Sequence, residues 1–214
     1  MKKTLIQVAL WVLIVLFGYL CVMSIVRPTE FNKVKKQRYE KVIQNLKDIR
    51  TAQVAYKDAN GSYTSSFDTL IDYVKNDSMK FIRAIGSLSD EQLEAGMTER
   101  EAVKKGLIFR DTIRIAALDT LFGKDYKIDE LRYVPYSNNT EEFKMATGEI
   151  KTASGMEIKV FEASVRNFVI FKNILDEYKD EILEFNGEKK RLDKFMGLKV
   201  GNVEEANNNV GNWE

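Results

Sequence analysis

The longest run of apolar side chains in the chain covers residues 5–26, and none of these 22 residues is charged. Only Gln7, Gly18, Cys21 and Ser24 interrupt the bulky apolar side chains. At about 1.5 Å of rise per residue, the run forms a helix of roughly 33 Å, enough to cross a bilayer core of about 30 Å. The run exceeds the usual signal-peptide core and lacks a small-residue cleavage site, so we expect an uncleaved signal anchor.

After Arg27 and Pro28 the pattern becomes that of an amphipathic helix, which continues to about residue 59. Its apolar positions step by three and four residues, as on one face of an α-helix. The members of this stalk seam are Tyr39, Val42, Leu46, Ile49, Gln53 and Tyr56. We expect the seam to pack along its length, on the chain's own sheet or in a homomeric coiled coil. Pro28 is a site where the helix can bend, and Asn60-Gly61 is a helix stop.

Beyond residue 60, short helical and strand-like segments alternate. Ser65 or Ser66 is expected to cap a short helix ending near Val74, and Thr98-x-x-Glu101 forms a capping box for another. Strands are predicted over residues 79–85, 107–116, 131–134, 143–152 and 156–165, the last two forming a hairpin. A long amphipathic helix is predicted over residues 167–185, with Asn186-Gly187 as its stop, and the tail from residue 197 as a polar, Gly- and Asn-rich loop.

Together these patterns predict an α+β protein. One long N-terminal transmembrane-plus-stalk helix packs on an antiparallel β-sheet of four or five strands, and a C-terminal amphipathic helix covers a further apolar surface. The predicted parts are a transmembrane signal anchor at residues 1–28, an amphipathic stalk at 29–60 and a soluble domain at 61–214.

Charge is distributed unevenly along a chain whose net charge is only +1. Residues 1–60 carry 11 Lys and Arg against 4 Asp and Glu, and the remainder carries 22 against 28. The basic cluster after the apolar run is expected to anchor to anionic lipid headgroups. Its members are Lys33, Lys35, Lys36, Arg38 and Lys41. By the positive-inside rule these residues would leave the domain in the cytoplasm.

The residue inventory excludes several chemistries. The chain has no histidine, and its only cysteine, Cys21, lies in the apolar run, so Cys/His zinc sites and disulfides within the domain are excluded. No phosphate-binding glycine loop, nucleophile elbow or metalloprotease motif occurs. The acidic residues of the 167–185 helix are interpreted as a solvated face. We expect neither an enzyme nor a nucleic-acid partner.

Two segments resemble a known family. Residues 49–63, with the sequence IRTAQVAYKDANGSY, followed by Leu70 and Val74, resemble the point where type IV pilin-like proteins leave their long helix. The ending NNNVGNW at residues 207–213 is similar to that of the major pseudopilins of type II secretion systems. The chain lacks the family's Gly–aromatic cleavage junction and the Glu within the apolar run, where Gln7 is the nearest polar residue.

The resemblance implies a function and a metal site. It implies a structural subunit of a bacterial envelope secretion or pilus-like assembly, in the inner membrane with the domain in the periplasm. In the family, an acidic loop before the ending binds calcium. Here the corresponding oxygen donors are those of Glu204, Glu205, Asn207 and Asn208, which form a candidate calcium loop, with no cofactor required.

Assembly is assigned to the N-terminal helix. The expected partners are the lipid bilayer and, through this helix, other envelope subunits or further copies of the chain. Gln7 is expected to pair with a neighbouring subunit, because a polar group in hydrocarbon requires a partner. The stalk seam docks the helix to the domain. One alternative is a non-polymerising, membrane-tethered accessory or binding protein, and another is a tethered domain facing the cytoplasm.

Overall fold

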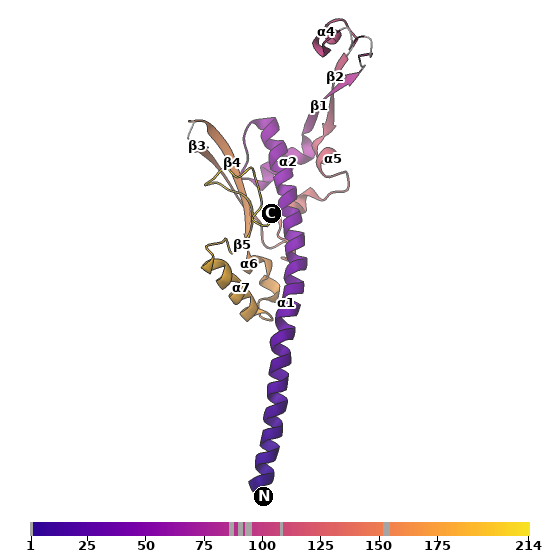
Figure 1. Cartoon of the computed structure of the whole chain (residues 1–214). Helices are drawn as coiled ribbons and strands as arrows, with labels where there is room; N and C mark the ends of the chain where they lie inside the picture. The colour runs from indigo at the N-terminus through magenta and orange to yellow at the C-terminus, as the bar shows by residue number, and fades with distance from the viewer. Residues whose placement is uncertain (1, 86–87, 90–91, 93–95, 108, 152–154) are drawn as a thin grey trace. The chain divides into compact units, whose positions relative to one another are not determined.

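A computed structural model describes residues 2–85, 88–89, 92, 96–107, 109–151 and 155–214 of the chain. The chain divides into two compact units: Met1–Arg50 with Leu131–Glu214, and Thr51–Glu130. The first helix, α1 (Lys2–Asn60), runs from the first unit into the second. The fold is α+β, with this long N-terminal helix and two small antiparallel sheets (Figure 1).

Helix α1 has 59 residues and continues through Pro28. Proline has no backbone N–H, so it cannot donate the hydrogen bond that other residues in a helix interior make to the carbonyl four positions earlier. At the next residue, the Thr29 hydroxyl donates a hydrogen bond to the Ile25 carbonyl at 2.8 Å. The helix ends as predicted, because Gly61 adopts a φ of 73° and its N–H bonds to the Lys57 carbonyl.

The apolar end of α1 has the properties of a membrane span. The part of α1 from Leu10 onward is long and apolar enough to cross a bilayer, and none of its most apolar 18-residue stretch is buried. A signal sequence near an N-terminus can meet the same criterion of length and apolar composition. The structure therefore supports one candidate span at the N-terminus, in agreement with the hydrophobic pattern.

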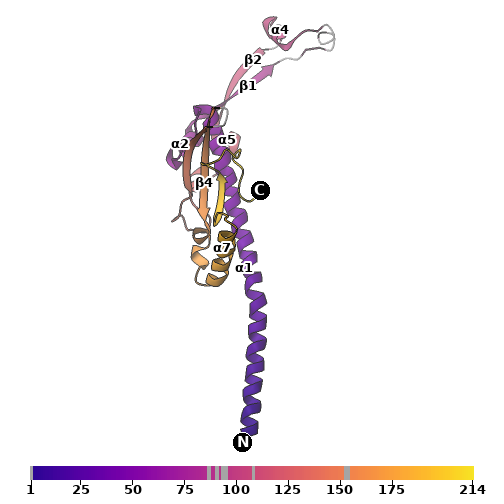
Figure 2. The ribbon, with the colours of Figure 1, turned by 60° about the vertical axis from the view of Figure 1, so that its left-hand side comes forward.

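The first unit contains a three-stranded antiparallel sheet in the order β3-β4-β5. Its strands are β3 (Lys144–Lys151), β4 (Glu157–Arg166) and β5 (Gly197–Gly201). The predicted hairpin is confirmed by the pairing of β3 with β4, and residues 152–154 at its turn lie outside the described residues. The buried side chains of Phe161, Ala163, Val165, Leu198 and Val200 supply its core. Figure 2 shows β4 and α7 beside α1.

Strand β5 corrects the prediction of a loop after residue 197. Its pairing with β4 requires close backbone approach, because a Cβ at Gly197 would lie 2.1 Å from the Val165 carbonyl oxygen. Gly201 ends the strand with a φ of 72°. The glycines that indicated a loop are the residues that allow this pairing.

The predicted strand at residues 131–134 is wrong. A 3₁₀ helix, η1 (Ile128–Arg132), occupies its start. Only a single bridge between Tyr133 and Glu142 follows. Pro135 then leads into a tight turn in which Tyr136, Asn138 and Asn139 have positive φ, so the chain reverses before a ladder can form.

The predicted helix over residues 167–185 is divided. It consists of α6 (Asn167–Ile170), the 3₁₀ turn η2 (Lys172–Ile174) and α7 (Lys179–Arg191). In a continuous helix the Ile170 carbonyl would accept the Ile174 N–H, but here it accepts a bond from Arg38, and Ile174 bonds to Phe171 instead.

The predicted stop at Asn186-Gly187 is also wrong, because α7 continues to Arg191. Gly187 does not take the positive φ of a helix cap, and Asn186 is buried with its side chain bonded to Asn167. Here Asn186 has a packing role within the helix.

The second unit confirms most of the local predictions. It contains α2 (Phe67–Asn76), β1 (Ser78–Ile85), α4 (Glu99–Lys104), β2 (Phe109–Ala116) and α5 (Ala117–Leu121). Ser66 caps α2 by accepting the Thr69 N–H, and Thr98 and Glu101 exchange both bonds of the capping box. Because β1 and β2 form a separate two-stranded antiparallel sheet, the prediction of one sheet of four or five strands is wrong.

Candidate functional site

The apolar segment of α1 is exposed along its length. Trp11 is 69% exposed and Ile25 is 71% exposed, although large apolar side chains usually find cover in a folded protein. Gln7 is also exposed in this segment. The segment is therefore a continuous apolar surface that water would solvate poorly. The assembly role of Gln7 stays a prediction.

The stalk seam is buried by the chain itself. Val42, Leu46 and Ile49 have no exposed surface, whereas Tyr39 and Tyr56 are half-buried. The Tyr39 ring stacks on Phe171 with 6.0 Å between centroids. In the second unit the Tyr56 ring meets Tyr73 edge-on at 5.3 Å. The predicted packing face is confirmed, and a homomeric coiled coil is not needed to bury it.

Arg38 is the charged residue most deeply involved in docking the stalk. Its side chain is only 7% exposed, and its Nη1 donates to the Ile170 carbonyl at 2.7 Å and to Asn173 Oδ1 at 2.6 Å. The guanidinium lies over the Tyr136 ring, 4.9 Å from its centroid. Burial lowers the pKa of Arg38, and Tyr136 acts in the opposite direction.

The basic cluster is divided between the domain and solvent. Lys35 Nζ lies 4.4 Å from the centre of the Phe185 ring, and burial lowers the pKa of Lys35 while Glu188 raises it. Arg38 is buried against the domain, whereas Lys35 is only half-buried, and the anchoring of the cluster to lipid headgroups stays a prediction. Lys33, Lys36 and Lys41 remain exposed.

A chain of hydrogen bonds links α1 to α7. Tyr39 Oη donates to Asn167 Oδ1 at 2.5 Å, and Asn167 Nδ2 donates to Asn186 Oδ1 at 2.6 Å. Asn167 has no exposed surface, so these bonds are shielded from water. Burial raises the pKa of Tyr39, although the bond to Asn167 opposes this effect. The network fixes the orientation of α7 against the stalk.

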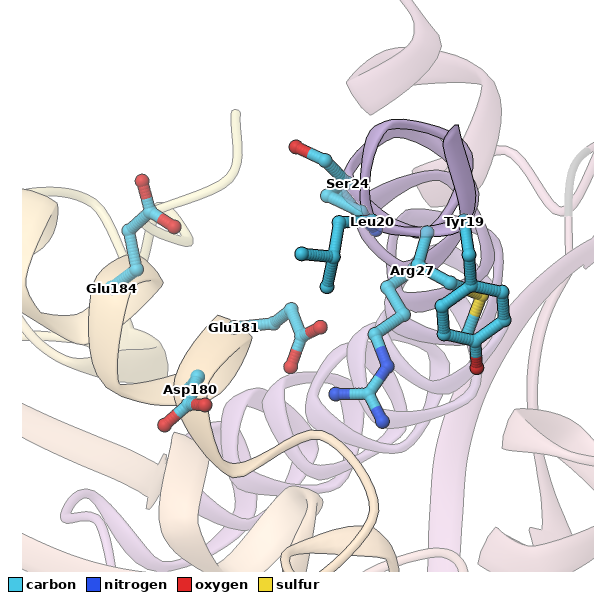
Figure 3. Close-up of a pocket in the computed structure, with 9 residues that line it drawn as sticks. Tyr19, Leu20, Ser24, Arg27, Asp180, Glu181 and Glu184 are labelled. Atoms are coloured by element: carbon cyan, nitrogen blue, oxygen red, sulfur yellow. The ribbon is translucent and has the colours of Figure 1, made fainter. Parts of the chain in front are cut away.

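A hollow of about 450 Å³ lies between α1 and the start of α7 (Figure 3). Its lining residues are Tyr19, Leu20, Met23, Ser24, Arg27 and Pro28 from α1, and Asp180, Glu181 and Glu184 from α7. Figure 3 shows the Arg27 side chain extending toward Glu181. The α1 side is largely apolar and carries Arg27, and the α7 side carries three carboxylates.

The acidic residues of the predicted 167–185 helix, of which Asp176 and Glu177 precede α7, match the predicted solvated face except at one position. Asp176, Glu177, Asp180 and Glu184 are exposed, as expected of a solvated face. Glu181 is half-buried, and its Oε2 atom is buried with no hydrogen-bond partner within the described part of the chain. A buried carboxylate oxygen without a donor is costly, which distinguishes Glu181 from its neighbours.

The candidate calcium residues lie in the C-terminal tail. Glu204, Glu205 and Asn208 are exposed, and Asn207 donates its side-chain N–H to the Val210 carbonyl at 3.3 Å. Among the described residues, no group of three or more His, Cys, Asp and Glu side chains is placed to hold a metal ion. Asn donors are outside that grouping, so the calcium loop stays a prediction.

The tail is attached to the rest of the first unit by bonds that sequence patterns did not indicate. Arg50 Nη1 donates to the Asn209 carbonyl at 3.1 Å and pairs with Glu214 at 2.9 Å. Asn212 accepts the Lys199 N–H and donates to the Gly197 carbonyl. Arg50 lies 164 residues before Glu214, so no local signal could have paired them.

Comparisons with protein-family models, curated proteins and solved structures find no match in any of the three sets. The resemblance to pilin-like proteins therefore rests on residues 49–63, residues 207–213 and the N-terminal helix.

Proposed function

We propose that this protein is a membrane-anchored structural subunit of a bacterial envelope assembly, similar to a pseudopilin of a secretion or pilus-like machine. The supporting observation is that one helix, α1, carries an exposed apolar segment at one end and a buried seam further along. In this proposal the exposed segment inserts into the bilayer and packs against other subunits, while the seam holds the domain.

Rigid docking of the stalk supports a mechanical role. Phe31 is buried against Phe171 and Tyr178, with ring centroids 5.6 and 5.7 Å away. Contacts by Arg38 and Arg50 follow further along the same helix. Such a series of contacts transmits force on α1 to the domain without a flexible linker.

The proposed location is the bacterial inner membrane, with the domain in the periplasm, as in the family that the sequence resembles. The positive-inside rule, which counts the Lys and Arg residues that flank the span, favours a cytoplasmic domain instead, and the protease experiment below distinguishes the two orientations.

The alternative function is that of a tethered accessory protein that does not polymerise. Substitution Gln7→Leu distinguishes the two roles. If Gln7 pairs with a neighbouring subunit, the variant is expected to reach the membrane at normal levels yet lose the high-mass complexes seen by cross-linking in native membranes. Gln44→Leu, on the exposed face of the stalk, is the matched control. Unchanged complexes in Gln7→Leu would favour the accessory role.

A protease-accessibility experiment tests the orientation. In intact spheroplasts, external protease is expected to digest a periplasmic domain and leave a short fragment containing the apolar segment of α1. Protection of the whole domain until the spheroplasts are lysed would contradict the proposed orientation and favour a cytoplasm-facing domain.

A further inference from the structure

The hollow between α1 and α7 lies at the exit of the proposed membrane span. The α1 residues that line it begin at Tyr19, within the apolar run, and end at Pro28. Across from them lie three carboxylates of α7. The following inference rests on the proposed insertion of α1 into a bilayer.

Charge determines the depth of this hollow in the bilayer. Leu20 and Arg27 are seven positions apart, which corresponds to about 10 Å along the helix. Carboxylates beside this stretch cannot lie in hydrocarbon without a large cost. The hollow therefore belongs in the headgroup layer, and the hydrocarbon core ends near Tyr19, an aromatic residue of the type enriched at such boundaries.

The lining of the hollow has three chemically different parts. Leu20 and Met23 provide an apolar wall on the membrane side, Arg27 provides a cation suited to a phosphate, and the α7 carboxylates provide hydrogen-bond acceptors. Glu181 Oε2 is buried and has no donor in the described part of the chain. A donor that enters the hollow would satisfy this oxygen.

We propose that the hollow binds one phospholipid with a zwitterionic headgroup that carries a primary ammonium, of the phosphatidylethanolamine type. The ammonium donates to Glu181 and its neighbouring carboxylates, the phosphate pairs with Arg27, and the acyl chains continue along the exposed apolar surface of α1. The volume of about 450 Å³ is within the roughly 300–1,000 Å³ range of small-molecule sites.

Charge complementarity selects this occupant over other lipids. An anionic headgroup such as phosphatidylglycerol brings a phosphate for Arg27 but faces three carboxylates without a compensating cation. A choline headgroup carries a positive charge but has no N–H to donate to Glu181 Oε2. The expected order of retention is ethanolamine, then choline, then glycerol headgroups.

The test uses the full chain, purified from membranes and exposed to equal amounts of the three lipids, with bound lipid counted by native mass spectrometry. The wild-type chain is expected to retain phosphatidylethanolamine preferentially. Glu181→Gln keeps the shape of the native side chain and removes its charge, and Arg27→Gln removes the cation while leaving a polar side chain. Each is expected to reduce that retention by about tenfold. Glu177→Gln, an exposed acidic residue outside the hollow, is the matched control and is expected to leave retention unchanged.

Two further readouts separate the inference from the proposed function. Resistance of the wild-type chain to carbonate extraction tests membrane insertion, and circular dichroism checks that each variant is folded. A chain that carbonate extracts would overturn both proposals. A chain that stays in the membrane but retains the three lipids equally, or whose folded Glu181→Gln variant retains phosphatidylethanolamine as the wild type does, would overturn the headgroup site alone.

Discussion

Arg38 of the stalk donates a 2.7 Å hydrogen bond to the backbone carbonyl of Ile170, 132 residues further along the chain. This bond occupies the carbonyl that would otherwise continue α6, so one contact both docks the stalk and divides a predicted helix. The same Nη1 also donates to Asn173 in the turn that follows. The position of α7 therefore depends on a residue in a different helix.

Replacing Arg38 with lysine is expected to lower the free energy of unfolding by about 1.5–3 kcal/mol, because lysine cannot reproduce the planar guanidinium that meets the carbonyl, the amide and the Tyr136 ring. The measurement is chemical denaturation of the full chain in detergent, followed by near-UV circular dichroism. Lys36→Gln, an exposed neighbour, is the control and is expected to change stability by no more than about 0.5 kcal/mol. Equal effects of the two substitutions would contradict a special role for Arg38.

The raised pKa of Tyr39 predicts that the stability of the fold depends on pH in the alkaline range. Its pKa is raised in the folded state, so the neutral phenol is favoured there, and its contribution is complete below the unfolded pKa of about 10. As the pH rises above that value, the unfolded chain loses its proton first, and the contribution is lost. Lys189 and Lys35 have lowered pKa values, mainly because they are buried, and act in the opposite direction.

The Tyr39→Phe variant isolates the tyrosine contribution. At neutral pH it is expected to lose about 1–3 kcal/mol, because Asn167 Oδ1 loses its donor in a buried position. The difference from the wild type should shrink between about pH 10 and pH 12. Thermal unfolding measured across this range checks the prediction, and a constant difference would show that Tyr39 does not titrate as argued.

Replacement by alanine is expected to change the stability in opposite directions at two glycines. At Gly197 the added Cβ would lie 2.1 Å from the Val165 carbonyl oxygen, so Gly197→Ala is expected to destabilise the first unit by about 1–3 kcal/mol. At Gly187, inside α7, the added Cβ meets nothing within 4 Å, and Gly187→Ala is expected to stabilise by about 0.5–1 kcal/mol. Denaturant titration of both variants gives the comparison. Destabilisation at Gly187 would contradict the continuation of α7 through this residue.

Features set by nearby residues were predictable from the sequence. The steps of four and three between Val42, Leu46 and Ile49 identified the buried face of the stalk, because helical periodicity is local. The Thr98–Glu101 capping box was predictable for the same reason. Each of these signals lies within a few turns of one helix.

Features that depend on distant residues were not predictable. Gly197 has the local signature of a loop, and only its approach to Val165 makes it part of a strand. Asn186 likewise has the local signature of a helix stop, and only its hydrogen bond with the distant Asn167 shows that it packs inside the helix. The hollow combines α1 residues near position 20 with α7 residues near position 180, and the isolated acidic pattern of α7 gave no indication that Glu181 differs from its neighbours.

The C-terminal tail is expected to remain folded without calcium. Its backbone is held by the Val200–Gly211 bridge and by the pairing of Arg50 with Glu214, which do not involve the candidate ligands Glu204 and Asn207. Adding a chelator to the full chain is therefore expected to shift the unfolding midpoint by less than about 2 °C. A larger, calcium-reversible shift would show that the tail binds the ion and depends on it.

The depth assigned to the hollow predicts which α1 residues contact water. If the hydrocarbon core ends near Tyr19, a cysteine at Ser24 lies in the headgroup layer, whereas a cysteine at Gly18 lies in hydrocarbon. In a Cys21→Ala background, which removes the only native thiol, a membrane-impermeant maleimide is expected to label Ser24→Cys and to leave Gly18→Cys unlabelled until detergent is added. The apolar residues 5–18 that remain in hydrocarbon span about 21 Å, so the proposed depth requires the bilayer core of about 30 Å to thin locally around the helix. Protection of both cysteines would place the exit beyond Ser24 and would require α7 to separate from α1 when the chain enters the membrane.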